Sequence, residues 1–335
     1  MKKGCPYGSH RVLEPAGVLP QAAWRLDNTM ELYDNELLIE VDKLNIDAAS
    51  FRQISEEAGG DPERIKEIIL RTVNERGKQH NPVTGSGGML IGSVREAGES
   101  FPVEVRRGQR IATLVSLTLT PLRLERIYEV DHARDQVRVD GQAVLFASGV
   151  FAPLPGDLPE DFALAVLDVA GAPAQTARLV KPGDTVLVIG GGGKSGLLCL
   201  FEAGKRAGVT GRVAGVSYSE RGCSRIRESG FADIVIQADA TRPLAFLEAL
   251  GAALDGALAD ITINCVDVPG TEMASILATR DGGTVYFFSM ATSFTAAALG
   301  AEGVGRDVRM LIGNGYARGH ADVALDIARQ VRHLF

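Results

Sequence analysis

One glycine-rich stretch, VLVIGGGGKSGLLCLF at residues 186–201, has residue types that bind phosphate groups. Its Gly-Lys-Ser triplet begins at Gly193 and resembles the end of an ATP-type P-loop. A P-loop also needs a glycine five positions before that residue. Val188 occupies this position, inside an apolar run typical of a buried strand. The spacing therefore excludes a P-loop.

The same stretch fits the dinucleotide-binding pattern G-x-G-x-x-G at Gly191, Gly193 and Gly196. Such a loop joins a strand to a helix, and its backbone N–H groups and the helix N-terminus attract a pyrophosphate. Lys194 and Ser195 would add a charged contact and a hydroxyl contact. Glycines also occur in ordinary strand–helix turns that bind nothing. The strand–helix alternation around this loop favours a dinucleotide site over such a turn.

The end of the next strand indicates which dinucleotide is bound. NAD sites commonly place an acidic residue about 20 residues beyond the glycines, to hold the ribose 2′-OH. Here the strand ends at Ser217, and Glu220 is the nearby acid that would reach a ribose. Ser217, Ser219 and Arg221 would receive a 2′-phosphate, and Tyr218 would stack on adenine. The sequence favours NADP, with NAD tolerated.

Two later strand ends should complete the cofactor site, because ligands of such sheets bind at the carboxyl ends of the strands. Cys265 and Val266 follow the fourth strand, and Ser289 and Met290 follow the fifth.

The chain divides into two parts of different pattern, residues 1–152 and 153–335. The first part contains short apolar strands and one charged helix, opened by Asp61-Pro62 and closed by Gly77. Three prolines in FAPLPGDLPED then indicate a linker. Strands and helices alternate beyond it, which predicts a doubly wound parallel sheet. We expect an α/β protein whose β-rich first domain precedes that sheet.

Composition excludes several classes of protein. The net charge is −7 and basic residues are scattered, so we expect no nucleic-acid partner. No apolar run reaches the roughly 18 residues of a membrane span, so we expect no membrane partner and a cytoplasmic protein. Four separated cysteines, Cys5, Cys199, Cys223 and Cys265, form no CxxC pair and fit a reducing compartment. Cys199 and Cys223 are expected to pack inside helices.

Segments from both halves resemble the medium-chain dehydrogenase/reductase superfamily: NPVTGSGGMLIGSV at 81–94, GQRI at 108–111 and KPGDTVLV at 181–188. The resemblance covers nearly the whole chain. It implies a GroES-like β-rich substrate domain, a Rossmann domain and an active site between them.

The chain departs from the zinc enzymes of that superfamily. Ser86 stands where they have a histidine ligand, and Gly87 replaces the following glutamate. Neither the catalytic cysteine expected near residues 44–47 nor a four-cysteine lobe is present. We therefore expect no zinc, and no Lewis acid to hold the substrate oxygen or nitrogen.

Other segments resemble more specifically the L-erythro-3,5-diaminohexanoate dehydrogenase family. They are KGCPYGSHRVLEPAGVLPQAAWRLDN at 3–28, LNIDAASFRQI at 44–54 and LVSLTLTPL at 114–122. The resemblance implies oxidative deamination of a diamino acid at C3, in lysine fermentation, with reduction of NAD or NADP. A homodimer is expected at the level of the superfamily.

This chemistry needs a base and groups that hold a carboxylate and ammonium groups. Asp47 is the first candidate for the base or the ammonium anchor, although a helix-cap role is equally expected. Ser50 and Asn45 share its loop. Ser86 and Thr84 would contact the reacting nitrogen or the substrate, or be plain turn residues.

The opening motif supplies three further candidates. Arg11 would hold the substrate carboxylate, His10 would relay protons, and Tyr7 would contact the substrate. A surface arginine and a structural histidine are the competing interpretations, and general residue statistics favour them. His80 is a weaker candidate for the base.

Two other functions stay open on the sequence alone. A zinc-independent quinone or enoyl reductase would need an apolar substrate pocket, and the polar candidates above count against it. A catalytically silent nucleotide-binding protein would need only the cofactor loop.

Overall fold

The computed structural model describes residues 1–81, 85, 87–313 and 315–332. The chain divides into two compact units, Met1–Asp157 and Leu158–Phe335. The division falls a few residues beyond the linker start expected from the sequence. Phe151–Pro153, expected in the linker, is instead a strand of the first unit.

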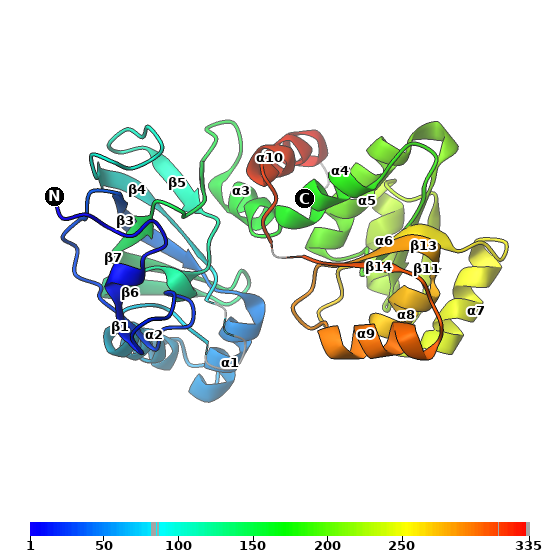
Figure 1. Ribbon diagram of the computed structural model, residues 1–335, viewed down its shortest axis with the longest axis horizontal. Coiled ribbons are helices and arrows are strands. Elements are labelled where there is room, and N and C mark those ends of the chain that lie inside the picture. The colour runs from blue at the N-terminus through cyan, green and yellow to red at the C-terminus, as the bar shows by residue number, and fades with distance from the viewer. Residues whose placement is uncertain (82–84, 86, 314, 333–335) are drawn as a thin grey trace. The chain divides into compact units, whose positions relative to one another are not determined.

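The first unit is built on an antiparallel sheet of six strands in the order β6-β7-β3-β4-β5-β8 (Figure 1). A two-stranded ribbon, β1 and β2, accompanies it. The strands are β1 (Val12–Glu14), β2 (Arg25–Leu26), β3 (Glu36–Asn45), β4 (Met89–Ala97), β5 (Arg110–Thr113), β6 (Leu122–Asp131), β7 (Gln136–Phe146) and β8 (Phe151–Pro153).

Two helices connect β3 to β4, α1 (Ala48–Ala58) and α2 (Pro62–Arg76). The caps of α2 are those the sequence predicts: the Asp61 carboxylate accepts the Glu63 N–H, and Gly77 ends the helix with a φ of 68°. Short 3₁₀ turns lie at Ser9–Arg11 and Leu117–Leu119.

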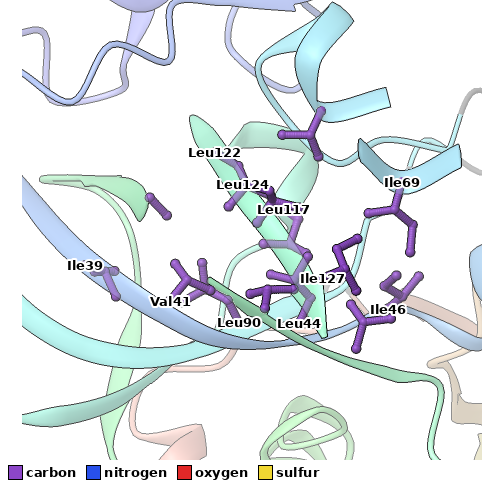
Figure 2. Packing of buried hydrophobic residues seen from close by; sticks show 14 of the residues in the cluster. Ile39, Val41, Leu44, Ile46, Ile69, Leu90, Leu117, Leu122, Leu124 and Ile127 are labelled. Atoms are coloured by element: carbon purple, nitrogen blue, oxygen red, sulfur yellow. The ribbon is translucent and has the colours of Figure 1, made fainter. Parts of the chain in front are cut away.

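Side chains from these elements fill one apolar interior, shown in Figure 2. Ile39, Val41 and Leu44 enter it from β3, Leu122 and Leu124 from β6. Ile69 and its α2 neighbours cover them. Burial of these side chains supplies most of the drive for this unit to fold.

The opening motif of the chain is anchored by a fully buried ion pair. The Arg11 guanidinium donates to both carboxylate oxygens of Glu36, at 2.6 and 2.7 Å, and also to the backbone oxygens of Thr29 and Glu31. Both charged side chains have no exposed surface. Desolvated charges persist only when such bonds satisfy them.

His10 belongs to the same cluster. Its Nδ1 accepts the backbone N–H of Cys5, so Nε2 carries the proton and donates to Glu36 at 2.8 Å. These contacts favour a structural role for Arg11 and His10 over the substrate contact and the proton relay expected from the sequence. Every strong donor of these side chains is used to hold residues 4–36 together.

The second unit contains a six-stranded, wholly parallel sheet in the order β11-β10-β9-β12-β13-β14 (Figure 1). The order reverses between β9 and β12, as in a Rossmann fold. The strands are β9 (Thr185–Ile189), β10 (Arg212–Ser217), β11 (Ile234–Gln237), β12 (Ala259–Asn264), β13 (Thr279–Phe287) and β14 (Arg309–Ile312).

Helices cover both faces of this sheet, as Figure 1 shows. Successive residues of β9 point to opposite faces: Val186 and Val188 pack on α4, α5 and α6, whereas Leu187 and Ile189 pack on α7 and α8. The helices are α3 (Glu160–Leu167), α4 (Gly171–Leu179), α5 (Lys194–Ala207), α6 (Glu220–Ser229), α7 (Pro243–Ala253), α8 (Glu272–Leu277), α9 (Phe294–Gly303) and α10 (His320–Val331). A 3₁₀ turn, Gly208–Thr210, follows α5. Among the described residues, no helix is long and apolar enough to cross a membrane.

The ion pair at Arg11 yields a prediction about stability. Arg11→Met leaves the Glu36 carboxylate buried without its main partner, so the free energy of unfolding should fall by about 3–5 kcal/mol. Urea unfolding can be followed by the fluorescence of Trp24, the only tryptophan in the chain, whose ring stacks on Arg76 in the same unit.

Arg95→Met is the matched control. Arg95, on β4, pairs with Glu40, which lies on β3 as Glu36 does. The side chains of Arg95 and Glu40 are both nearly half exposed. Loss of such a surface pair should change stability little. Equal unfolding curves for the two variants would contradict a stabilising role for the buried pair.

Candidate cofactor and substrate sites

A cavity of about 440 Å³ lies at the carboxyl ends of the central strands of the second unit. Its wall comes from the residues that follow β9, β10, β11 and β12, together with Thr271 before α8. This is the edge of the sheet where the strand order reverses, the general ligand site of such folds.

The glycine loop forms one side of this cavity through Gly190 and Gly193. Gly190 has a φ of 81°, a conformation that favours glycine. Gly193 caps the N-terminus of α5. The first N–H groups of a helix have no acceptor within the helix, so those of α5 remain for an anion.

Gly196 lets α5 pack directly against the loop. A Cβ at this position would collide with the backbone oxygen of Gly190 and lie 2.7 Å from Cα of Gly191. Gly191 itself is buried and donates its N–H to Val216. The sequence did not predict that Gly190 belongs to this loop. Its position directly after the strand was the only signal of its positive φ.

Sequence reasoning also missed a second glycine contact. A Cβ at Gly192 would lie 2.6 Å from Cα of Gly222, in the first turn of α6. The two backbones touch, which brings the start of α6 to the glycine loop. A glycine inside a helix is unfavourable without a packing reason, and that was the available signal at Gly222.

Lys194 and Ser195 lie in the first turn of α5 and are partly exposed. Lys194 Nζ donates to the Asp168 carboxylate at 2.8 Å. The ammonium group predicted to reach a phosphate therefore already has an anionic partner in this structure.

The end of β10 is open to the cavity through Ser217 and Tyr218. The Tyr218 ring is 75% exposed. Ser219 caps α6 by accepting the N–H of Gly222, and Arg221 is exposed in the first turn of that helix. Glu220 pairs with Arg227 at 2.6 Å, so its carboxylate is directed along the helix.

A carboxylate not considered from the sequence lies in the cavity wall. Asp239 follows β11, and its Oδ1 accepts both the N–H and the hydroxyl of Thr241. These bonds lower the pKa of Asp239, which keeps it ionised at neutral pH. An acid two residues after the third strand was the signal in the sequence.

The last predicted cofactor contacts divide into two groups. Cys265 and Val266 line the cavity at the end of β12. Ser289 and Met290 follow β13; Ser289 contacts Asp267 at 3.4 Å, and Met290 is largely exposed. Neither of these two is among the described residues that line the cavity.

In the first unit, two candidate residues, Asp47 and Ser50, form a hydrogen-bonded chain with Asn81 at the start of α1. The Asp47 carboxylate caps the helix through the Ser50 N–H and accepts the Ser50 hydroxyl at 2.5 Å. Ser50 Oγ in turn accepts from Asn81 Nδ2 at 3.0 Å. Asp47 is therefore a helix cap. The carboxylate has further lone pairs that can accept a proton or another hydrogen bond.

Two buried polar atoms lie in the segment just before Asn81. Gln79 Oε1 and His80 Nδ1 have no hydrogen-bond partner within the described part of the chain. Burial and the positive charges of Lys78 and Arg76 lower the pKa of His80 to about 4, so its imidazole is neutral at pH 7. Buried acceptors without donors are rare in folded proteins and often mark ligand sites.

The other predicted residues of this unit are placed as follows. Asn45 Oδ1 accepts from Gln136 in the interior, and Tyr7 is exposed just before the first 3₁₀ turn. Thr84 and Ser86 lie outside the described residues. Within the described residues, no group of three or more His, Cys, Asp or Glu side chains could hold a metal ion.

The packing at Gly196 gives a second prediction. Gly196→Ala should weaken binding of NADPH at least about tenfold, because the added methyl group displaces the loop that carries the N–H groups. Fluorescence titration with the reduced cofactor measures this. Gly204→Ala, exposed on the same helix with only Phe231 O at 3.7 Å, should bind normally. Equal affinity for the two variants would show that the loop has room for a side chain.

Comparison with known proteins places this arrangement in a family. A profile of the L-erythro-3,5-diaminohexanoate dehydrogenase N-terminal domain matches residues 10–155. L-erythro-3,5-diaminohexanoate dehydrogenase from Acetoanaerobium sticklandii is 56% identical over 330 residues, 98% of this chain and 96% of the relative. The enzyme of that name from Fusobacterium nucleatum is 53% identical over 332 residues, with the same coverage.

Solved structures with the same fold include a mycobacterial quinone oxidoreductase, with a TM-score of 0.59 at 17% identity over 93% of this chain and 86% of that one. An alcohol dehydrogenase from Thermus has a TM-score of 0.55 at 16% identity, with 94% and 86% covered. A mycobacterial protein complexed with NADPH has 0.52 at 16%, with 94% and 84% covered.

The structural likenesses confirm the fold: a GroES-like β-rich domain followed by a Rossmann domain, as in the medium-chain dehydrogenases/reductases. A nicotinamide cofactor accords with this fold and with the cavity at the strand ends. At 53–56% identity over almost its whole length, the chain belongs to the L-erythro-3,5-diaminohexanoate dehydrogenase family.

Proposed function

We propose that this protein oxidises L-erythro-3,5-diaminohexanoate to 5-amino-3-oxohexanoate and ammonia, with reduction of a nicotinamide cofactor, as a step of lysine fermentation. The observation that carries the proposal is the identity above 50% to two dehydrogenases of that name across nearly the full chain. The cavity at the strand ends supports it, because a hydride acceptor needs such a site.

The bond changes define what the protein must supply. The cofactor, when bound, accepts hydride from C3 of the substrate. The C3 ammonium must first lose a proton to become a neutral amine. Loss of hydride from C3 of that amine leaves an iminium, which must take up water before ammonia leaves. A positioned base serves both proton transfers.

The chain Asp47–Ser50–Asn81 is our candidate for this base. The Asp47 carboxylate can accept bonds beyond those of the helix cap, and Ser50 offers a hydroxyl through which a proton can pass. Asn81 fixes the Ser50 hydroxyl from the other side. Gln79 Oε1 and His80 Nδ1 add neutral acceptors suited to ammonium N–H groups.

Asp47→Asn tests the role of the base. Asparagine caps helices as well as aspartate does, so the fold should be kept. Turnover should fall by at least about 100-fold, because an amide cannot accept the proton. Cofactor affinity should not change, since Asp47 lies in the other unit.

Asp61→Asn is the control for this variant. Asp61 caps α2 as Asp47 caps α1, and its carboxylate accepts the Glu63 N–H. It should retain wild-type turnover. If both variants turn over normally, Asp47 is a helix cap and nothing more.

NADP is the cofactor that we propose as preferred, with NAD tolerated. The strand end at Ser217 carries no carboxylate, and Glu220 is engaged by Arg227. Ser217, Ser219 and Arg221 can then approach a 2′-phosphate, and the acid of the same segment, Glu220, is neutralised by its own partner. Asp239 supplies an ionised acceptor for hydroxyl or amino groups of the adenosine.

Arg221→Ala should lower affinity for NADP about tenfold or more and leave affinity for NAD unchanged, because only NADP carries a 2′-phosphate. Arg225→Ala, one turn further along the exposed face of α6, controls for general charge. A parallel loss for both cofactors would remove Arg221 from phosphate recognition.

One assay tests the reaction itself. Absorbance of the reduced cofactor should rise when the protein is mixed with L-erythro-3,5-diaminohexanoate and NADP or NAD, with ammonia released in equal amount. Turnover of a quinone or an enoyl thioester, without turnover of the diamino acid, would overturn the proposal.

We also propose that the protein is a cytoplasmic homodimer. Its four cysteines are free thiols, as in a reducing compartment.

Strand β14 is an edge of the parallel sheet, and Ile312 on it is 56% exposed. Edge strands pair readily with a second copy, and a lysine on the edge blocks such pairing. Ile312→Lys should convert the dimer to a monomer in sedimentation; a wild-type monomer would contradict the proposal.

A further inference from the structure

Two cysteines far apart in the sequence meet behind the cofactor cavity. Cys199 lies in the middle of α5, and Cys265 follows β12; their Sγ atoms are 4.0 Å apart. Both belong to the apolar cluster between the sheet and α5. The proposed dehydrogenase reaction uses neither thiol.

The two thiols differ in access. Cys265 is partly exposed and is one of the residues that line the cofactor cavity, so a small molecule in the cavity meets this residue. Cys199 is completely buried. Burial and the neighbouring thiol raise the pKa of Cys199, so it is not the first to react.

The backbone at Cys265 is also joined to the floor of the cavity. Its N–H donates to the carbonyl of Ile189, the last residue of β9, at 2.9 Å. A Cβ at Gly190 would lie 3.1 Å from the carbonyl carbon of Cys265. Any shift of Cys265 towards α5 therefore disturbs the start of the glycine loop.

We propose that Cys265 and Cys199 form an oxidative modification site, which a peroxide entering the empty cofactor cavity converts to a disulfide. The Cys265 thiolate attacks one peroxide oxygen, giving a sulfenic acid and releasing hydroxide, which is protonated to water. The Cys199 thiol then attacks the sulfenic sulfur, and a second water leaves. Two thiols are oxidised and one peroxide is reduced to two waters.

This modification should oppose cofactor binding. The sulfurs must approach by about 2 Å to form the bond. Movement of Cys265 towards Cys199 would strain its contacts with the Ile189–Gly190 segment. A bound dinucleotide covers the cavity wall at Cys265 and should protect the thiol. Oxidation and cofactor binding would then exclude one another. The inference concerns the thiols and the cavity and does not depend on the identity of the oxidised substrate.

The experiment treats the whole protein with hydrogen peroxide and maps disulfides by mass spectrometry of non-reduced peptides. We expect a peptide pair that joins residues 199 and 265, its reversal by dithiothreitol, and at least about tenfold slower formation with saturating NADP. NADPH affinity of the oxidised protein, measured after removal of peroxide, should fall at least about tenfold.

Single variants test the assignment. Cys199→Ser should stop at a Cys265 sulfenic acid that a dimedone probe traps, and Cys265→Ser should give no cross-link. Cys223→Ser removes another buried thiol of the same unit, on α6, and should cross-link as the wild type does.

Three results would overturn the proposal. They are the absence of the 199–265 link at peroxide levels that leave the fold intact by circular dichroism, a link that involves Cys223 or Cys5 instead, and formation that is equally fast with and without NADP. A link that leaves NADPH affinity unchanged would refute the effect on the cofactor.

Discussion

The cofactor cavity depends on backbone atoms that lie where a side chain would otherwise be. Gly196 brings α5 against the turn after β9, and Gly192 meets Gly222 at the start of α6. A methyl group at Gly196 or Gly192 would overlap backbone, which cannot move aside as a side chain can, and one at Gly222 would overlap the Ser217 side chain. The N-termini of two helices therefore converge on the same strand ends. The glycine loop before α5 and the end of β10 both line the cavity.

Several charged side chains around the same cavity are already bound to other residues of the protein. Glu220 is engaged by Arg227 and Lys194 by Asp168, so two charged groups beside the site are held by protein partners. Asp239 is held ionised by Thr241 in the wall. These pairings determine which polar groups of the cavity wall are left to contact a ligand. Cys265 joins this wall to the apolar cluster behind it.

In the first unit, hydrogen-bond saturation separates structural polar residues from candidates for chemistry. Arg11 and Glu36 are buried, and each strong donor or acceptor has a partner within the unit. Gln79 is buried and His80 is partly buried, yet Gln79 Oε1 and His80 Nδ1 have no hydrogen-bond partner among the described residues. The first arrangement stabilises the fold, whereas the second leaves capacity for a ligand with N–H donors, which the diammonium substrate has.

The sequence by itself determined the features that depend on a few neighbouring residues. The strand–helix alternation of the second unit, the caps of α2 and the loop-to-helix transition at residue 193 all follow from short-range backbone preferences. The full-length family resemblance was also readable, because it rests on residue order alone. Phe151–Pro153 was misassigned to a linker because proline signals outweighed a short strand whose pairing with β5 is not local.

Only the tertiary structure decided what the polar side chains do. The motif around His10 and Arg11 identified the family correctly, but it did not reveal that Glu36, 26 and 25 residues further along the chain, binds both side chains. Gly190, Gly222 and Asp239 entered the cofactor site, and Cys199 met Cys265, through contacts between separate elements. Such contacts depend on how distant segments pack, and no short stretch of sequence encodes the partner that a side chain will find.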